Sequence, residues 1–160
     1  MIDTPAQDNL PVRILILEDC ADRRSVMEDC LSDRFPQYGV RFFLTAPEMV
    51  EYLKEQTVDD LMLISLDHDL EPPPNQPGSD PGCGRDVADC LSTMKPVCPV
   101  VIHTTNNPAG DGMRFVLDDA GWTTIRIVPY DGEQWIGETW FRGVRNAIVR
   151  SVSPTADLPV

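Results

Sequence analysis

The stretch Asp59–Pro74 reads Asp-Asp-Leu-Met-Leu-Ile-Ser-Leu-Asp-His-Asp-Leu-Glu-Pro-Pro-Pro, and it decides the fold of this chain. Its first part, Leu61–Leu66, is a nearly continuous apolar run that only Ser65 interrupts. A short apolar run bounded by polar and turn residues is typical of a strand that is buried on both faces, as in a parallel sheet. The run ends in Asp67-His68-Asp69, and open parallel sheets bind their ligands just beyond the carboxyl ends of their strands.

The composition is that of one globular domain with an excess of negative charge. The chain has 160 residues, of which 42% are hydrophobic and 24% are charged. The formal net charge of −13 argues against a duplex nucleic acid as partner, because binding to that backbone needs clustered lysine and arginine. No apolar run approaches the roughly 20 residues of a membrane span, and the polar start is not a signal peptide. We therefore expect a cytoplasmic protein with no membrane partner.

Apolar runs and helical patterns alternate five times along the chain. The expected strands are residues 12–17, 40–44, 61–66, 99–103 and 123–128, and the expected helices are residues 21–35, 45–56, 85–94, 113–120 and 133–151. Such alternation predicts an α/β fold, a three-layer αβα sandwich around a parallel sheet. Five units with right-handed crossovers suit the flavodoxin-like strand order 2-1-3-4-5. We expect a single domain over residues 11–151, with disordered tails at residues 1–10 and 152–160.

Polar residues follow three of these strands where each strand ends. Glu18-Asp19 ends the first strand, Asp67-His68-Asp69 the third, and His103-Thr104-Thr105-Asn106 the fourth. In the order 2-1-3-4-5 the first and third strands are neighbours at the switch point, and the fourth strand lies next to them. We therefore expect one acidic cluster of Glu18, Asp19, Asp67 and Asp69, with both histidines at the same edge of the sheet.

These four carboxylates indicate a divalent-metal site. Carboxylates at one edge would repel each other and raise each other's pKa values unless a cation joined them. Hard cations such as Mg²⁺ prefer oxygen ligands, so Mg²⁺ is the favoured ion. Adding the imidazoles would shift the preference toward Mn²⁺ and other transition metals. The alternative gives Glu18 and Asp19 only the roles of a helix cap and a solvated carboxylate.

The chain resembles the receiver domain of two-component response regulators over roughly residues 12–150. The resemblance rests on Glu18-Asp19, Asp67, Thr104 and Pro129-Tyr130. It implies that the acidic residues hold Mg²⁺ and that Asp67 is the phosphoacceptor. The lysine that receivers carry before the Pro-aromatic pair is missing, and Val128 stands in its place. This departure argues against phosphorylation of Asp67, because no obvious group would neutralise the phosphoryl charge.

A narrower resemblance is to the cyclic-phosphate processing receiver domains. It rests on Leu-Asp-His-Asp-Leu at 66–70, Gly-Arg-Asp-Val-Ala at 84–88, and Ile-His-Thr-Thr-Asn at 102–106, followed by Gly110 and Met113. The resemblance implies a stand-alone domain that acts on, or senses, cyclic phosphate ends of RNA or nucleotides through His68 and His103. Thr104 and Asn106 of the third motif are further candidates for binding the ligand.

His68 and His103 admit a catalytic and a structural interpretation. Opening a cyclic phosphate requires activation of a water and protonation of a leaving oxygen, and two imidazoles with pKa values near 6.5 can do both. In the alternative, both are buried and hydrogen-bonded. Along a pleated strand His68 points opposite to Asp67 and Asp69, so the three share a pocket only if the strand has ended by Asp67.

The long loop of residues 71–84 and the residue that follows it are candidates for binding an anion. The loop is rich in proline and glycine, and its backbone N–H groups could cradle an anion at the next helix start, with Arg85 as the counter-charge. The alternative is a flexible connection.

Three functions remain open at the level of sequence. The first is a domain that binds or hydrolyses a small phosphate ligand or an RNA end, as a cyclic phosphodiesterase would, with His68, His103 and Asp67 as catalytic residues. The second is a phosphorelay receiver with Asp67 as phosphoacceptor. The third is a non-catalytic interaction module with a protein partner.

Overall fold

The computed structural model describes residues 10–130 and 132–152, and these contain a parallel sheet of five strands. The strands are β1 (Val12–Leu17), β2 (Gly39–Phe43), β3 (Leu63–Leu66), β4 (Val100–His103) and β5 (Thr124–Ile127). Their order is β2-β1-β3-β4-β5, and every neighbouring pair is parallel. The predicted flavodoxin-like order 2-1-3-4-5 is therefore confirmed. The predicted tails lie outside the described residues apart from Leu10 and Val152.

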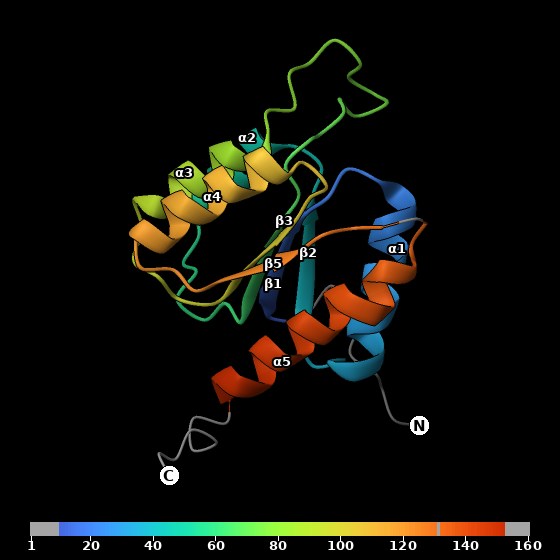
Figure 1. Cartoon of the computed structure of the whole chain (residues 1–160), viewed down its shortest axis with the longest axis vertical. Coiled ribbons are helices and arrows are strands. Elements are labelled where there is room, and N and C mark those ends of the chain that lie inside the picture. Colours follow the sequence, from blue (N-terminus) through green and yellow to red (C-terminus); the bar gives the residue numbers. More distant parts are fainter. Residues whose placement is uncertain (1–9, 131, 153–160) are drawn as a thin grey trace.

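Helices cover both faces of the sheet (Figure 1). One face carries α1 (Ala21–Arg34) and α5 (Phe141–Val152), and the other carries α2 (Ala46–Glu55), α3 (Gly84–Ser92) and α4 (Asn107–Asp119). The predicted three-layer sandwich is confirmed. None of the described helices is both long enough and apolar enough to cross a membrane.

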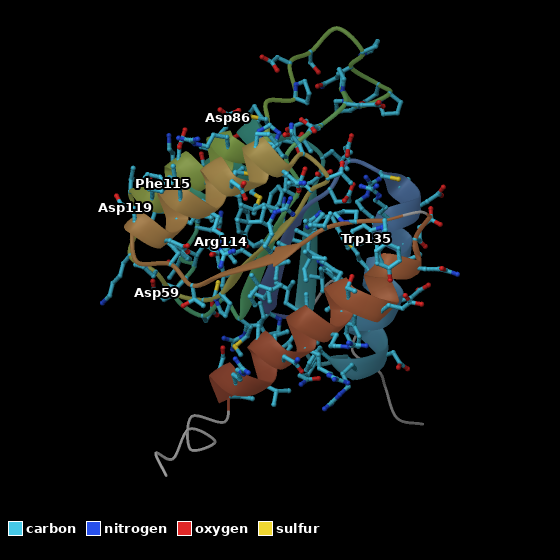
Figure 2. The ribbon with its side chains drawn as sticks, in the orientation of Figure 1. Asp59, Asp86, Arg114, Phe115, Asp119 and Trp135 are labelled. Carbon is cyan, nitrogen blue, oxygen red and sulfur yellow. The ribbon has the colours of Figure 1, made fainter. Side chains whose placement is uncertain are left out.

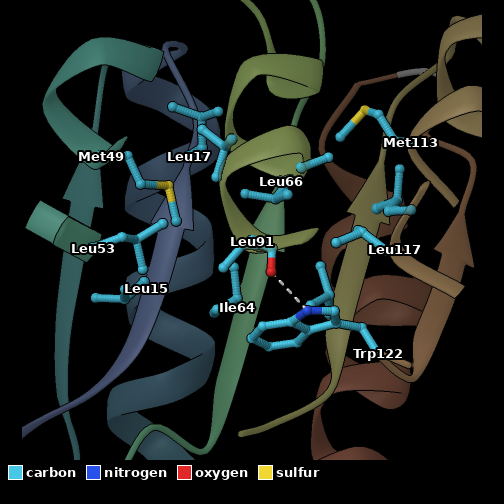
Figure 3. Close-up of a cluster of buried hydrophobic side chains, with 14 of the residues drawn as sticks. Leu15, Leu17, Met49, Leu53, Ile64, Leu66, Leu91, Met113, Leu117 and Trp122 are labelled. Atoms are coloured by element: carbon cyan, nitrogen blue, oxygen red, sulfur yellow. Dashed lines mark hydrogen bonds between the residues drawn. The ribbon is translucent and has the colours of Figure 1, made fainter. Parts of the chain in front are cut away.

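Side chains of the strands alternate between two hydrophobic cores. Leu17 and Leu66 belong to the core under α2, α3 and α4, where Trp122 donates its Nε1 hydrogen to the carbonyl oxygen of Leu91 at 2.9 Å (Figure 3). Ile16 and Leu63 belong to the core under α1 and α5. Because both faces of the sheet are covered, both sets of side chains are apolar, and this explains the continuous apolar run in the sequence.

Two helix boundaries differ from the sequence predictions. Helix α4 begins at Asn107 rather than near residue 113, because the Asn106 side chain accepts a hydrogen bond from the Ala109 N–H at 3.2 Å and Pro108 occupies the first turn. The final helix does not run regularly from residue 133. A π-helix, η2 (Ile136–Trp140), precedes α5, and π-helical turns are frequent at functional sites.

The segment between β3 and α3 rises above the carboxyl ends of the strands, as the green loop at the top of Figure 1. Hydrogen bonds tie both of its ends to the sheet. The Glu71 N–H donates to Asp19 Oδ2 at 2.7 Å, and the Gly84 N–H donates to the carbonyl oxygen of His68 at 2.9 Å. A Cβ atom on Gly84 would lie 2.0 Å from the carbonyl oxygen of Asp67, so only glycine fits where α3 begins.

We expect the substitution Gly84→Ala to lower the free energy of unfolding by about 1–3 kcal/mol or more, because the added methyl group must displace the backbone at Asp67. Alanine is otherwise the better helix former, so intrinsic propensity acts in the opposite direction. The matched control is Gly78→Ala in the same loop, where a Cβ atom meets nothing within 4 Å. Urea denaturation measures both variants. Equal stability of the two variants would contradict the close approach of α3 to β3.

Candidate functional site

Two buried carboxylates and a buried imidazole meet at the carboxyl ends of β1, β3 and β4. Glu18, Asp67 and His103 each offer one ligand atom, and these atoms all lie within 4.8 Å of one another. Glu18 and His103 have no exposed surface, and Asp67 is 6% exposed. Parallel strands bring them together: the Asp67 N–H donates to the carbonyl oxygen of Leu17 at 3.0 Å, which aligns the ends of β1 and β3.

A buried chain of polar groups runs from η2 to Glu18. Trp140 Nε1 donates to Ser65 Oγ at 3.0 Å, Ser65 Oγ lies 2.8 Å from His103 Nδ1, and His103 Nε2 lies 3.0 Å from Glu18 Oε2. The donor and acceptor types assign the protons. A carboxylate can only accept, so His103 Nε2 carries a proton, and Ser65 Oγ accepts from Trp140 and is also hydrogen-bonded to Nδ1. Both nitrogens of His103 are therefore engaged in hydrogen bonds inside the protein.

The neighbours of Glu18 keep it ionised. Burial alone raises the pKa of Glu18, but several groups outweigh it, so the pKa is lowered overall. The largest of them is His103, through its hydrogen bond and its charge. The Cys20 N–H, which donates to Oε1 at 3.1 Å, and the Arg23 guanidinium act in the same direction.

The pKa of Asp67 is shifted in the opposite direction from that of Glu18. Burial is the main cause that raises the pKa of Asp67 to about 7, and the Glu18 and Asp19 carboxylates add to the increase. His103 and the His68 N–H, which donates to Oδ1 at 2.7 Å, oppose it. Burial also raises the pKa of Asp19. A divalent cation would relieve the mutual repulsion of these carboxylates, and their oxygen atoms are the ligands that such ions prefer.

A cavity of about 550 Å³ opens beside Asp67, and we call it the acidic pocket. Three groups of residues line most of it: the carboxylates Asp19, Asp67 and Asp69; the arginines Arg23 and Arg24; and the apolar residues Leu44, Leu70, Pro72, Pro73 and Pro74. Three of the four predicted metal ligands therefore share one pocket, and the fourth, Glu18, lies within 4.8 Å of Asp67. The volume falls within the roughly 300–1,000 Å³ of small-molecule sites.

Arg23 and Arg24 are site residues that the sequence reasoning missed. Arg24 Nη1 donates to the carbonyl oxygen of Glu18 at 3.1 Å. The Arg23 guanidinium lies 5.3 Å from the ring centroid of Trp135, which Figure 2 shows on the side of α1 and α5, and its Nη1 lies 3.9 Å from Glu18 Oε2. The sequence did offer a signal for them. Both lie in the first turn of the helix that follows Glu18-Asp19, and that turn starts at the edge of the sheet where the site was expected.

The predicted ligand-binding residues lie in three different settings. Arg85 is exposed on α3, where its Nε donates to Asp89 at 2.7 Å, and it does not line the acidic pocket. Thr104 is buried, and its Oγ1 accepts from the Asn106 N–H at 3.1 Å. Asn106 caps α4, and its Nδ2 donates to Asp69 Oδ2 at 3.3 Å. The structure thus places Asn106, but not Arg85, in contact with a residue of the pocket.

The two histidines have separate surroundings. His68 Nδ1 lies 2.9 Å from Asp69 Oδ1, and its side chain is 17% exposed. Within residues 10–130 and 132–152, no hydrogen bond or ring contact joins His68 to His103. Asp69 accepts the Nδ1 proton of His68, which leaves the lone pair of a neutral imidazole on Nε2. His68 and Asp69 therefore form a pair at the surface, whereas His103 belongs to the interior.

The family model of the cyclic-phosphate processing receiver domain matches residues 13–119. No curated protein matches this chain. The match spans β1 to the end of α4, and it includes every residue of the acidic pocket.

Solved receiver domains have the same fold. The phosphorylated cyanobacterial phytochrome response regulator RcpA is 20% identical with a TM-score of 0.60, over 93% of this chain and 99% of that chain. The response regulator domain of Thermotoga maritima CheB is 19% identical with a TM-score of 0.59, over 86% of this chain and 96% of that chain. A CheY-like receiver domain from Methanospirillum hungatei is 17% identical with a TM-score of 0.57, over 85% and 95%. At these identities the likeness shows the fold alone.

We expect metal-free Asp67→Asn to be more stable than the wild type at pH 8 and equally stable at pH 4. The folded protein raises the pKa of Asp67 from 3.8 to about 7, so it binds this proton more tightly than the unfolded chain does. Protonation of Asp67 therefore stabilises the folded protein. This stabilisation is present in full below pH 4 and is lost as the pH rises through 7. At 1.36 kcal/mol per pKa unit, the advantage of asparagine at pH 8 reaches at most about 4 kcal/mol. Urea titrations at both pH values in a chelator measure it, and a difference that does not change with pH would contradict the assignment.

We also expect the two histidines to be opposite tautomers in the metal-free protein. His103 should carry its proton on Nε2, where Glu18 accepts it, and neutral His68 should carry its proton on Nδ1, where Asp69 accepts it. Long-range ¹H–¹⁵N correlation spectra distinguish the tautomers. The substitution Ser65→Ala removes the hydroxyl that is hydrogen-bonded to His103 Nδ1 and should perturb the His103 signals while leaving those of His68 unchanged. A proton on Nδ1 of neutral wild-type His103 would disprove the assignment.

Proposed function

Because the chain belongs to the cyclic-phosphate processing receiver domain family, we propose that its acidic pocket binds the phosphate of a 2′,3′-cyclic phosphate together with a divalent metal ion. The ligand is a nucleotide or the end of an RNA strand. One observation carries the proposal: the buried carboxylates of Glu18 and Asp67 meet His103 beside a cavity of about 550 Å³. Carboxylates alone would repel a phosphate, so the metal is needed for the two to share the pocket.

Receiver domains commonly bind Mg²⁺ through acidic residues, and this chain brings a comparable group together. Glu18 and Asp67 would hold the ion, with Asp19 beside them in the pocket, and oxygen ligands suit Mg²⁺. His103 donates to Glu18, so it orients a ligand of the metal in the manner of an outer-shell partner. Mn²⁺ becomes the better ion if the His103 imidazole joins the ligands directly. When bound, the metal would neutralise charge on the phosphate.

His68 is the imidazole that suits proton transfer. Asp69 fixes its orientation through Nδ1, as the acidic member of a catalytic triad does for its histidine. The lone pair on Nε2 would then accept a proton from a water that attacks the cyclic phosphate, and the resulting imidazolium would return that proton to the ribose oxygen as its bond to phosphorus breaks. His103 has both nitrogens engaged in the interior, so its role is to position Glu18. The two imidazoles thus take different tasks in place of the acid–base pair expected from the sequence.

We predict that His68→Ala lowers the turnover of 2′,3′-cyclic nucleotides by about 10²-fold and leaves the affinity for Mn²⁺ unchanged. His103→Ala should weaken Mn²⁺ binding roughly 10-fold to 100-fold, as the loss of an outer-shell partner does. His103→Gln should retain much of that affinity, because its amide N–H can still donate to Glu18.

Calorimetry with Mn²⁺ and ³¹P NMR of the cyclic nucleotides give the two readouts, and Arg114→Gln on the exposed side of α4 is the control. If the wild type binds neither Mn²⁺ nor a cyclic nucleotide, the proposal is wrong. If it binds both without turnover, the protein is a binding module and His68 is not a catalytic base. Equal losses of Mn²⁺ affinity in His103→Ala and His103→Gln would make His103 a direct metal ligand.

A phosphorelay receiver with Asp67 as phosphoacceptor is the second candidate. The observation that favours it is the arginine pair in the acidic pocket, since Arg23 and Arg24 supply positive charge that the position of Val128 lacks. We rank it second because the raised pKa of Asp67 leaves less of the nucleophilic carboxylate near neutral pH. Intact-mass spectrometry after incubation with acetyl phosphate and Mg²⁺ tests it. A stoichiometric phosphate adduct that Asp67→Asn abolishes would reverse the ranking.

A further inference from the structure

We propose that the acidic pocket takes a single nucleoside phosphate, in which Arg23 and Arg24 bind the phosphate and an apolar wall of Leu44, Leu70 and Pro72–Pro74 binds the nucleoside. This inference rests on the proposed function for the metal and the phosphate. It adds which residues recognise the ligand and how large the ligand is.

The two arginines have the setting of anion-binding residues. Both come from the first turn of α1, and both line the pocket together with Asp67. Each has few contacts: Arg24 donates through Nη1 to the carbonyl oxygen of Glu18, and Arg23 lies over the ring of Trp135 with its Nη1 3.9 Å from Glu18 Oε2. A guanidinium has five N–H donors, so these contacts leave most of its capacity for a phosphate, which it can bind in bidentate fashion.

The two arginines pair only weakly with the carboxylates of the site. Arg23 Nη1 lies 3.9 Å from Glu18 Oε2, at the limit of an ion pair, and no ion pair joins Arg24 to a carboxylate among the described residues. A metal held by Glu18 and Asp67 would leave the guanidinium groups facing the phosphate that bridges from the metal. Positive charge would then surround the phosphate from two directions.

The apolar wall offers a surface that cannot bind a phosphate and can contact an apolar part of a ligand. Leu44 follows β2, and the three prolines open the loop after β3. Proline has no N–H and a fixed φ, so this wall is rigid and offers no donor to an anion. The hydrogen bond from the Glu71 N–H to Asp19 Oδ2 ties the residue before the proline run to a carboxylate of the pocket, so the wall is held in place before the ligand binds. Apolar side chains beside a phosphate site suit a nucleobase or the face of a ribose.

The charge of the chain limits the ligand to one nucleotide. The net charge is −13, and Glu71, which lines the pocket, is exposed. Each further phosphate of an oligonucleotide would have to approach this surface without a basic partner, whereas polymer binding depends on neutralising successive phosphates. A mononucleotide places its only phosphate between the metal and the arginines and meets none of this repulsion.

The test measures the affinity of the full chain, in the presence of Mn²⁺, for inorganic phosphate, uridine, uridine 2′,3′-cyclic phosphate and a ten-nucleotide RNA that ends in a cyclic phosphate. We expect the cyclic nucleotide to bind at least tenfold more tightly than inorganic phosphate or uridine, and the RNA to bind no more tightly than the mononucleotide. Arg23→Gln should weaken binding of both phosphate and cyclic nucleotide at least tenfold. Leu44→Ala should weaken only the cyclic nucleotide.

The affinity for Mn²⁺ separates a lost contact from a damaged fold. Removal of the positive charge of Arg23 near Glu18 should leave Mn²⁺ binding equal or tighter, whereas a damaged site would weaken Mn²⁺ and phosphate together. Arg24→Lys keeps the charge but not the bidentate geometry. Its affinity for the cyclic nucleotide should lie between those of the wild type and Arg24→Gln. Arg34→Gln, at the other end of α1, is the control and should change none of these affinities.

Two outcomes distinguish this inference from the proposed function. If inorganic phosphate binds as tightly as the cyclic nucleotide and Leu44→Ala has no effect, the nucleoside does not use the apolar wall and the inference is wrong, although metal-dependent phosphate binding stands. Tighter binding of the RNA would also overturn the limit to one nucleotide. If no phosphate ligand binds in Mn²⁺, the proposed function itself fails.

Discussion

The rest of the site depends on one carboxylate that has no contact with solvent. Glu18 directly follows β1 and is fully buried, so its charge must be balanced inside the protein. His103, the Cys20 N–H and the Arg23 guanidinium together outweigh the cost of burial, which is why the pKa of Glu18 is lowered. The groups that stabilise the ionised form of Asp67 do not outweigh its burial, so its pKa rises to about 7. A divalent cation bound between Glu18 and Asp67 would favour the ionised form of Asp67, whose pKa is raised without it.

The support for Glu18 extends through the fold to η2. Ser65 is the polar residue that interrupts the apolar run of β3, and it connects Trp140 to His103. Trp135 contributes its ring to both His103 and Arg23. Trp135, directly before η2, and Trp140, at its end, thus contact different members of the site. A change in the position of η2 would act on Glu18 through these contacts, with no contact to the ligand itself.

The position of positive charge distinguishes this chain from the receiver pattern. Val128 occupies the place after β5 where receivers carry lysine, and it is 49% exposed. Arg23 and Arg24 put positive charge on the other side of Asp67, at the start of α1. The adjacent loop brings three prolines over the same pocket. The pocket beside Asp67 has a volume of about 550 Å³, which falls within the roughly 300–1,000 Å³ of small-molecule sites.

The sequence by itself determined the strand order and the edge of the sheet at which the site lies. Apolar runs and helical patterns are local, and parallel strands joined by right-handed crossovers must end at one edge, so Glu18, Asp67 and His103 were expected together. Only the tertiary structure decided the direction of each side chain. His103 continues the pleat of β4 into the interior, whereas β3 has ended before His68, which lies near the surface with Asp69. Arg85 and the pair Arg23 and Arg24 all begin helices near this edge, but the packing of α3 and α1 sends only the pair toward the pocket. Such directions depend on where a strand stops and how a helix packs, and these are properties of the whole fold.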